Sequence, residues 1–315
     1  MRLLITGGAG FIGSNFVRYM LSEHNDVDII VLDKLTYAGN MSSLQDVLND
    51  VEFIKGDICD ETTVKKSIRY CDCVVNFAAE THVDRSISSS TAFVQTDVLG
   101  VHVLLLAAKD CQIERFIQVS TDEVYGSTDR APFKEGDPLR PSSPYAASKA
   151  GADLLALSFF TTYGFPCVIT RSSNNYGPYQ HPEKMIPRFI TSAMRNRELP
   201  VYGQGDNVRD WIHVADNCAA IDYIRQRGEL GETYNIGAGN EHSNLETTNA
   251  ILRLVGKPST LIAFTTDRLG HDKRYSLDCS KIETLGWQPK ISFEEGLAQV
   301  VQWYRDNEWW WAPLV

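Results

Sequence analysis

The stretch TGGAGFIG at residues 6–13 decides the fold. An apolar run at 3–5 precedes it and predicts a strand, and a helical pattern at 14–22 follows it. The glycines satisfy both GxGxxG and GxxGxxG, spacings that bring a backbone close to a pyrophosphate at the start of a helix. The stretch therefore predicts the opening strand, loop and helix of a dinucleotide-binding domain.

A carboxylate stands where such a domain needs one. Asp33 ends the next predicted strand, 28–33, and follows the last glycine of the fingerprint by 20 residues. A carboxylate there accepts from a ribose 2′-hydroxyl and repels a 2′-phosphate, which favours NAD over NADP. Asp57, after the third predicted strand, is a candidate for the adenine side, and a solvated loop Asp fits the sequence equally well. An ordinary glycine turn beside a surface Asp is the alternative, and the order of strand, glycines, helix and Asp argues against it.

The first half of the chain alternates apolar runs with longer helical patterns. Further strands are predicted at 51–55, 73–77, 115–120 and 167–170, and helices at 96–108 and 145–163. Unbroken apolar runs suit strands that are buried on both faces, and the alternation is typical of right-handed βαβ units. We therefore expect an α/β fold with a Rossmann doubly wound parallel sheet.

After Arg171 the regular alternation of strand and helix patterns ends. Prolines fall at 178, 182, 187 and 200, polar loops lengthen, and elements such as the helix at 245–255 are shorter. This predicts a NAD-binding Rossmann domain over 1–173 and a smaller C-terminal α/β substrate-binding domain over 174–315. The segment near 207–237 is a candidate to return to the first domain.

The composition excludes several classes of protein. The 315 residues carry 30 Lys and Arg against 40 Asp and Glu, a net charge of −10, so we expect no nucleic-acid partner. No run approaches the roughly 18 apolar residues of a membrane span, and we expect no membrane partner. The seven cysteines include no CxxC pair, which indicates reduced thiols in a cytoplasmic protein without disulfides or a metal site. Tryptophans at 309–311 fit a packed tail better than a membrane-interface belt.

Tyr145 and Lys149 form a YxxxK motif at the start of a predicted helix. The i, i+4 spacing places both side chains on one helix face. A phenol with a pKa near 10 is a weak base at neutral pH, and the Lys149 ammonium with a cationic nicotinamide nearby would lower that pKa by about 3. Chance placement on a solvated helix is the alternative. The preceding strand end, Ser120-Thr121, favours a catalytic pair.

Together TGGAGFIG, YxxxK and the strand-end hydroxyls resemble the extended short-chain dehydrogenase/reductase superfamily. The segment STDEVYG at 120–126 is similar to the Thr-Asp-Glu mark of its nucleotide-sugar 4,6-dehydratase family. Other segments resemble the family members that act on dTDP-glucose: AAETHVDRSI at 78–87, NNYGPYQHPEKMIPR at 174–188, RDWIHVAD at 209–216, DRLGHDKRY at 267–275 and NEWWWAPL at 307–314. The resemblance runs from residue 3 to residue 314.

The resemblance implies an enzyme, a hydro-lyase that oxidises the sugar at C4, eliminates water across C5 and C6 and returns the hydride to C6. It implies that Tyr145, positioned by Thr121 and assisted by Lys149, is the base for the C4 hydroxyl. Glu123 would remove the C5 proton and Asp122 would protonate the C6 hydroxyl. Asp122 must then stay protonated near neutral pH, which burial and a neighbouring carboxylate can achieve. Because the hydride leaves and returns on one cofactor, NAD is expected to stay bound.

The family pattern also implies binding residues. For NAD these are Gly7, Gly10, Phe11, Ile12, Gly13, Asp33, Lys34, Leu35, Thr36, Asp57, Ile58, Phe77, Ala78, Ala79, Thr96, Tyr145, Lys149 and Asn175. For the nucleotide sugar they are Thr81, Thr121, Asn174, Lys184, Met185, Pro200, Tyr202, Arg209, Asn244, Arg268, His271 and Tyr275. Arginine suits bidentate phosphate contacts, and Lys184 suits a point charge.

Several alternatives stay open. Another nucleotide sugar, such as UDP-glucose, is the nearest, and a nucleotide-sugar 4-epimerase is a second, against which the adjacent carboxyl pair at 122–123 argues. A silent NAD-sensing regulator is a third, against which the intact catalytic residues argue. Family members pair through a four-helix bundle, so we expect a homodimer, and the pathway implied is deoxysugar biosynthesis, including rhamnose. The apolar helix faces that would pair also fit a cover for the sheet (Val98, Val101, Leu105, Leu154, Leu157, Phe160).

Overall fold

Seven parallel strands form the large sheet, in the order β10-β6-β5-β4-β1-β2-β3. The computed structural model describes residues 1–267 and 270–315. The strands are β1 (Arg2–Thr6), β2 (Asp28–Asp33), β3 (Glu52–Lys55), β4 (Cys73–Asn76), β5 (Arg115–Thr121), β6 (Cys167–Ser172) and β10 (Thr233–Ile236). The strand order reverses between β1 and β4, and the carboxyl ends of such strands border the ligand crevice of a doubly wound sheet. The predicted Rossmann sheet is confirmed.

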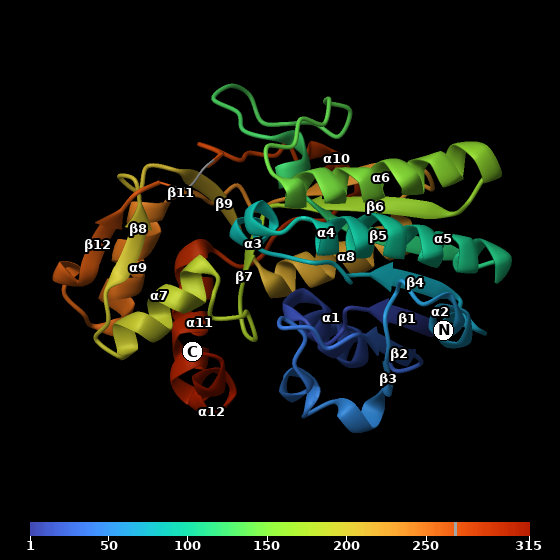
Figure 1. Ribbon diagram of the computed structural model, residues 1–315, viewed down its shortest axis with the longest axis horizontal. Coiled ribbons are helices and arrows are strands. Elements are labelled where there is room, and N and C mark those ends of the chain that lie inside the picture. Colours follow the sequence, from blue (N-terminus) through green and yellow to red (C-terminus); the bar gives the residue numbers. More distant parts are fainter. Residues whose placement is uncertain (268–269) are drawn as a thin grey trace.

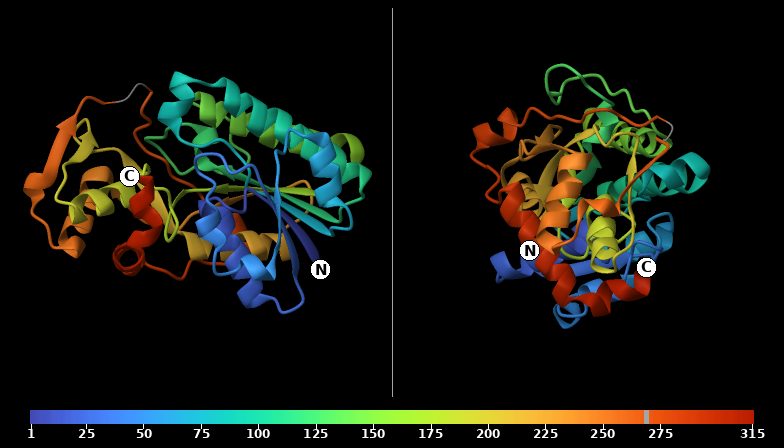
Figure 2. Two further views of the ribbon diagram at one scale, coloured as in Figure 1. Left: turned by 60° about the horizontal axis from the view of Figure 1, so that its bottom comes forward. Right: turned by 90° about the vertical axis from the view of Figure 1, so that its left-hand side faces the viewer.

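Successive residues of the central strands point to opposite faces of the sheet. Leu3 and Ile5 belong to one core with α1 (Phe11–Glu23) and α8 (Val214–Arg227), whereas Leu4 belongs to another with α2 (Glu61–Ile68), α5 (Val101–Asp110) and α6 (Pro144–Tyr163). The left view of Figure 2 shows α5 and α6 over one face and α1 and α8 over the other. Burial on both faces explains the unbroken apolar runs.

Helix boundaries follow from their caps. Gly10 is the N-cap of α1, so the helix begins at Phe11, three residues earlier than expected, and the fingerprint itself forms the helix start. The Ser143 side chain accepts from the Ala146 amide, and Pro144 occupies the first turn, which starts α6 just before Tyr145. The YxxxK motif therefore lies in the first turns of a well-capped helix.

The helix expected at 96–108 is longer in the structure. It runs continuously through α4 (Thr91–Phe93), a π-helical segment η3 (Val94–Gly100) and α5. By length and composition alone, Thr91–Asp110 could cross a membrane. Leu104, Leu105 and Ala108 from this helix are nonetheless buried in the core against the sheet, as in any domain built on a central sheet.

The second half of the chain builds a smaller α/β body beside the carboxyl edge of the large sheet (Figure 1). It holds a three-stranded sheet and a two-stranded one, made of β7 (Asn174–Tyr176), β9 (Val208–His213), β11 (Glu241–Ser243), β8 (Leu199–Tyr202) and β12 (Ile262–Thr265). Its helices are α7 (Met185–Met194), α9 (Asn244–Val255), α11 (Phe293–Asp306) and α12 (Glu308–Trp311). Trp310 and Trp311 are buried in its aromatic core, as expected for a packed tail.

The chain returns to the large sheet twice, first through α8 and β10 and again, after β12, through α10 (Ser280–Leu285). The segment from α8 to β10 leaves the smaller body, β10 pairs with β6, and α10 packs on β10. Short elements complete the described chain: α3 (Val83–Ser88), η1 (Met41–Leu44), η2 (Leu48–Asp50), η4 (Asp122–Tyr125), η5 (Ser259–Leu261) and η6 (Ala312–Leu314). Sequence patterns did not predict β10, because a four-residue strand carries little periodicity.

Candidate active site

Two neighbouring clefts open at the carboxyl edge of the large sheet. One, here called the cofactor cleft, encloses about 1220 Å³ between protein atoms, open solvent included, and runs along the fingerprint and the first turns of α6. The other, the substrate cleft, encloses about 1050 Å³ and lies under α7, β8 and β9. Gln180, Glu183 and Lys184 border both clefts, which therefore form one continuous site.

The glycines of the fingerprint leave room for a group that approaches the backbone. Gly7 has φ +67°, and a Cβ there would lie 2.6 Å from the Ala78 amide nitrogen. A Cβ on Gly13 would lie 2.3 Å from the Gly7 carbonyl oxygen. These positions tolerate only glycine, and they aim the start of α1 into the cleft. The cradle fits a dinucleotide pyrophosphate at a helix N-terminus.

Asp33 lies at the end of β2, where the cofactor cleft begins. Its carboxylate accepts from the amides of Ala9 at 2.9 Å and Leu35 at 2.8 Å, and burial raises its pKa. Asp33 thus braces the glycine loop in addition to facing the cleft. Beside it, Lys34 pairs with Asp57 at 2.6 Å, which fixes two more of the expected cofactor residues.

Most residues expected to bind NAD line this cleft. They are Gly7, Gly10, Phe11, Ile12, Gly13, Asp33, Lys34, Thr36, Asp57, Ile58, Phe77, Ala78, Ala79, Thr96, Tyr145 and Lys149. Two lie elsewhere: Leu35 packs against the core on the α1 side of the sheet, and Asn175 lines the substrate cleft. Their assignment to the cofactor remains a prediction from the resemblance.

Tyr145 and Lys149 line the inner end of the cofactor cleft. Lys149 is buried and donates to the Val119 carbonyl at 2.7 Å, and burial lowers its pKa. In the protein alone, burial first, then the charges of Glu123, Asp97 and Asp122, raise the pKa of Tyr145 well above its usual value. These carboxyl groups come from segments that the YxxxK motif does not include, so the motif alone does not indicate their effect. The expected lowering depends on the charge of a bound nicotinamide and stays a prediction for the loaded site.

Asp122 and Glu123 follow β5 in η4 and have different surroundings. The Thr121 hydroxyl donates to Asp122 at 3.1 Å and accepts from the Glu123 amide at 3.2 Å. Asp122 is 3% exposed, and within the described residues its Oδ2 has no hydrogen-bond partner. Burial, followed by the neighbouring Glu123 charge, raises the pKa of Asp122 well above its usual value. Glu123 instead lines the substrate cleft.

The substrate cleft gathers most of the expected sugar-nucleotide residues. Asn174, Lys184, Met185, Pro200, Tyr202, Arg209, Asn244, His271 and Tyr275 line it. Thr81 lines the cofactor cleft, and its hydroxyl accepts from Lys184 Nζ at 3.0 Å, at the junction of the two clefts. Arg268 lies outside the described residues. Phe189 and Trp211 also line this cleft and were not predicted, because apolar periodicity indicates only a core position.

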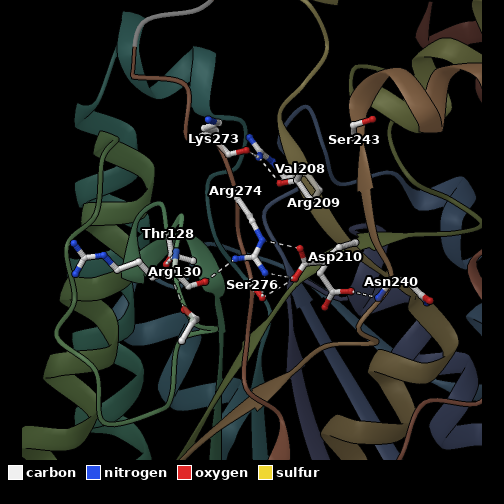
Figure 3. A network of polar contacts seen from close by, with 12 residues as sticks. Thr128, Arg130, Val208, Arg209, Asp210, Asn240, Ser243, Lys273, Arg274 and Ser276 are labelled. Carbon is white, nitrogen blue, oxygen red and sulfur yellow. Dashed lines mark hydrogen bonds and ion pairs between the residues drawn. The ribbon is translucent and has the colours of Figure 1, made fainter.

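Arg209 is held rigidly beside this cleft. It is 5% exposed, donates to the carbonyls of Asp272 at 2.9 Å and Val208 at 2.7 Å, and lies 4.3 Å from the Tyr275 ring centroid. Figure 3 shows the surrounding network, in which the Arg274 guanidinium makes two 2.7 Å contacts with the Glu241 carboxylate. These contacts fix the segment that carries Tyr275 against β9 and β11.

Comparison with known proteins shows the family to which the chain belongs. A family model described as GDP-mannose 4,6 dehydratase matches residues 4–300. The chain belongs to the GDP-mannose 4,6 dehydratase family. Among related members, the low-salt glycan biosynthesis protein Agl12 of Haloferax volcanii is 53% identical, over 98% of this chain and 100% of its own. A dTDP-glucose 4,6-dehydratase of an Actinoplanes species is 50% identical, over 99% and 100%.

Solved structures of dehydratases and of an epimerase share the fold of this family member. The dTDP-glucose 4,6-dehydratase DesIV of Streptomyces venezuelae, solved with NAD bound, is 50% identical with a TM-score of 0.98, and the match covers 100% of both chains. A UDP-glucose 4-epimerase of Thermus thermophilus, also with NAD, is 30% identical with a TM-score of 0.91, over 98% and 100%. The fold is thus common to both activities, and the side chains of the site must separate them.

Proposed function

We propose that this chain is an NAD-dependent 4,6-dehydratase that converts dTDP-glucose into dTDP-4-keto-6-deoxyglucose. Whole-length relatives that are about half identical carry the name dTDP-glucose 4,6-dehydratase. The observation that carries the proposal is the pair at 122–123: a buried carboxyl with a raised pKa next to a carboxyl on the substrate cleft. Elimination of water needs one acid and one base, and this pair supplies both.

The first step is oxidation at C4. Tyr145 removes the proton of the C4 hydroxyl, and Thr121 orients that hydroxyl. NAD, when bound in the cofactor cleft, accepts a hydride from C4 and returns it to C6 at the end. Because burial and then the charges of Glu123 and Asp97 oppose ionisation of Tyr145, the phenol needs both the Lys149 ammonium and the positive charge of the oxidised nicotinamide. Tyr145 therefore becomes a base only in the loaded site.

The second step is elimination. The 4-ketone makes the C5 proton acidic, and the Glu123 carboxylate removes it. Asp122 holds a proton because it is buried beside a like charge, and it passes that proton to the C6 hydroxyl, which leaves as water. Reprotonation at C5 and return of the hydride to C6 complete the product. In this scheme substrate and product differ by one water, and no external reductant is consumed.

We assign the substrate cleft to the nucleotide diphosphate. Arg209 and Lys184 supply positive charge in a chain whose net charge is −10, and Arg268 would add to it. Phe189 and Trp211 supply apolar and aromatic surface of the kind that holds a planar base. We also assign contacts with the sugar to Thr81, which lies where the two clefts meet, and to Thr121, which lines neither cleft in this structure.

The nearest rivals are dehydration of another nucleotide sugar and 4-epimerisation. An epimerase shares the fold and needs no acid–base carboxyl pair, so the buried Asp122 favours dehydration. The test is a panel of dTDP-, UDP-, GDP- and CDP-glucose read by mass spectrometry. We expect dTDP-glucose to lose one water with the highest kcat/KM. Conversion of a nucleotide-glucose to its 4-epimer without loss of mass would reject the proposal.

We also propose a cytoplasmic homodimer in deoxysugar biosynthesis, such as the route to rhamnose. Val101 and Leu105 of the expected pairing face are buried against the sheet, so they cover it. Large apolar side chains of the neighbouring helices nonetheless stay exposed (Leu99, Leu106, Leu154, Phe160). An apolar face shared by two adjacent helices fits a four-helix bundle with a second copy.

A further inference from the structure

Three chain segments meet at the rim of the cofactor cleft. They are the loop at 34–39 after β2, the turn at 79–81 after β4, and residues 177–184 between β7 and α7, here called the strap. The strap comes from the smaller body and borders both clefts. Figure 1 shows it between α7 and α1. A ligand in the cofactor cleft would therefore lie behind all three segments.

A small group of side chains joins these segments to one another. The Tyr37 hydroxyl donates to the Thr81 carbonyl at 2.8 Å. The Arg85 guanidinium lies 3.7 Å from the Tyr37 ring centroid and pairs with the Glu183 carboxylate at 3.1 Å. Lys184 of the strap donates to the Thr81 hydroxyl at 3.0 Å. These contacts link the three segments to one another, and Arg85 on α3 joins Tyr37 to the strap.

The strap is also fixed at its other end. Asn15 on α1 donates to the Pro178 carbonyl at 2.9 Å, and the Arg18 guanidinium lies 4.1 Å from the Tyr179 ring centroid. Tyr304 on α11 donates to the Gln180 carbonyl. Because α1 belongs to the large sheet and α11 to the smaller body, the strap is held by both. Opening the cleft at this point requires the contacts of Tyr37 and Arg85 to break.

In the proposed reaction, closure of the cofactor cleft would keep NAD bound between the two hydride transfers. The hydride taken from C4 must return to C6 of the same sugar, so a cofactor that left midway would strand an unfinished intermediate. Burial, then the Glu183 charge, raise the pKa of Tyr37, so its hydroxyl keeps the proton that it donates. Neither Tyr37 nor Arg85 lines either cleft, and no step of the proposed reaction uses either side chain.

We propose that Tyr37, Arg85 and Glu183 form a clasp that closes the cofactor cleft and slows the release of NAD during turnover. The inference rests on the proposed function, since it assigns these residues to the retention of that cofactor. The clasp acts on the rate at which NAD leaves. It differs in this from Asp33 and the glycine loop, which would contact the cofactor itself.

The experiment measures NAD release directly. Purified protein loaded with radiolabelled NAD is mixed with a large excess of unlabelled NAD, and the loss of label is followed over time. Arg85→Met keeps most of the length of the side chain and removes its charge, Tyr37→Phe removes one hydroxyl, and Glu183→Gln removes the carboxylate that pairs with Arg85. Arg69→Met is the matched control, because Arg69 lies over the exposed Tyr70 ring at 4.8 Å, at the end of α2.

We expect Arg85→Met to lose label about 10-fold faster than wild type, equivalent to about 1.4 kcal/mol in the release barrier. Tyr37→Phe and Glu183→Gln should be several-fold faster, and the Arg85→Met/Glu183→Gln double variant should be no faster than Arg85→Met alone, since the two share one contact. Release at the Arg69→Met rate in all three variants would overturn the clasp. A wild-type protein that takes up no NAD would instead overturn the proposed function, and dehydration of dTDP-glucose by the same preparation distinguishes the two failures.

Discussion

At the scale of single residues, two adjacent carboxyl groups acquire opposite tasks from their surroundings. Asp122 is buried with one oxygen unpartnered among the described residues, which favours its protonated form. Glu123 reaches the substrate cleft from the next position in the chain. Asp122 and Glu123 are adjacent in the chain directly after β5, yet their different surroundings make one suited to act as the acid and the other as the base. This separation is the step in which the proposed dehydratase differs from an epimerase of the same fold.

Asp33 offers a test of the cofactor site at this scale. Asp33→Ala should weaken NAD binding by about 1–3 kcal/mol, roughly 5- to 150-fold, because it removes charged hydrogen bonds both to the cofactor and to the glycine loop. Isothermal titration calorimetry with NAD gives the Kd. Asp28→Ala, an exposed position at the start of the same strand, is the control. Equal affinities for both variants would show that the fingerprint is misassigned.

At the scale of elements, the π-helical segment η3 places a buried carboxyl group, that of Asp97, where its charge acts on Tyr145 and Lys149. Asp97 accepts from the Glu80 amide at 2.9 Å and from the Ser148 hydroxyl at 2.6 Å, and burial raises its pKa to about 6. Its charge also opposes ionisation of Tyr145. A π-helical turn at this place is consistent with the frequent occurrence of such turns at functional sites.

Asp97 predicts how stability depends on pH. Its pKa rises from 3.8 to about 6 on folding, so the folded state holds the proton longer and the unfolding free energy falls as the pH rises from about 4 to about 6. The loss amounts to about 3 kcal/mol. Asp33 and Asp122 also have raised pKa values and add slopes of the same sign, so the test is the difference between variants. In urea denaturation Asp97→Asn should lose about 3 kcal/mol less than wild type over this pH range, whereas Asp110→Asn, exposed at the end of the same helix, should match wild type. An unchanged slope in Asp97→Asn would place the buried titration elsewhere.

Local sequence patterns predicted the glycine loop, the carboxylate at the end of the second strand and the catalytic helix that line the cofactor cleft. The glycines, Asp33 and the YxxxK motif were identifiable because each depends on neighbours within a few residues along the chain. The π-helical turn and β10 were not, because they depend on packing against strands far away in sequence. For the same reason the motif did not predict the raised pKa of Tyr145 in the protein alone, because burial first and then the charges of Glu123 and Asp97 from other elements cause it.

At the scale of the whole molecule, two bodies share one continuous site. The smaller body supplies Arg209 and the strap, and the large sheet supplies the glycine loop, the carboxyl pair and α6. The contacts across this boundary join residues more than 90 positions apart, as Arg85 and Glu183 show. Residues at such separations leave no local pattern, so only the family resemblance pointed to the substrate side.

The exposed apolar face of α5 and α6 predicts self-association. Wild-type protein should sediment as a dimer in analytical ultracentrifugation, and Leu154→Glu, at a side chain that is 58% exposed, should shift it to monomer by placing a charge in the interface. Leu48→Glu, at an exposed leucine in η2 on another part of the surface, should leave the dimer intact. A monomeric wild type, or a dimer that survives Leu154→Glu, would contradict this interface.

The most direct measurement is the conversion of dTDP-glucose by the purified protein in heavy water, followed by mass spectrometry and NMR. The product should lack one water and carry one solvent deuteron at C5, and Glu123→Gln should give neither change. A product of unchanged mass with an inverted C4, or water loss that persists in Glu123→Gln, would contradict the account.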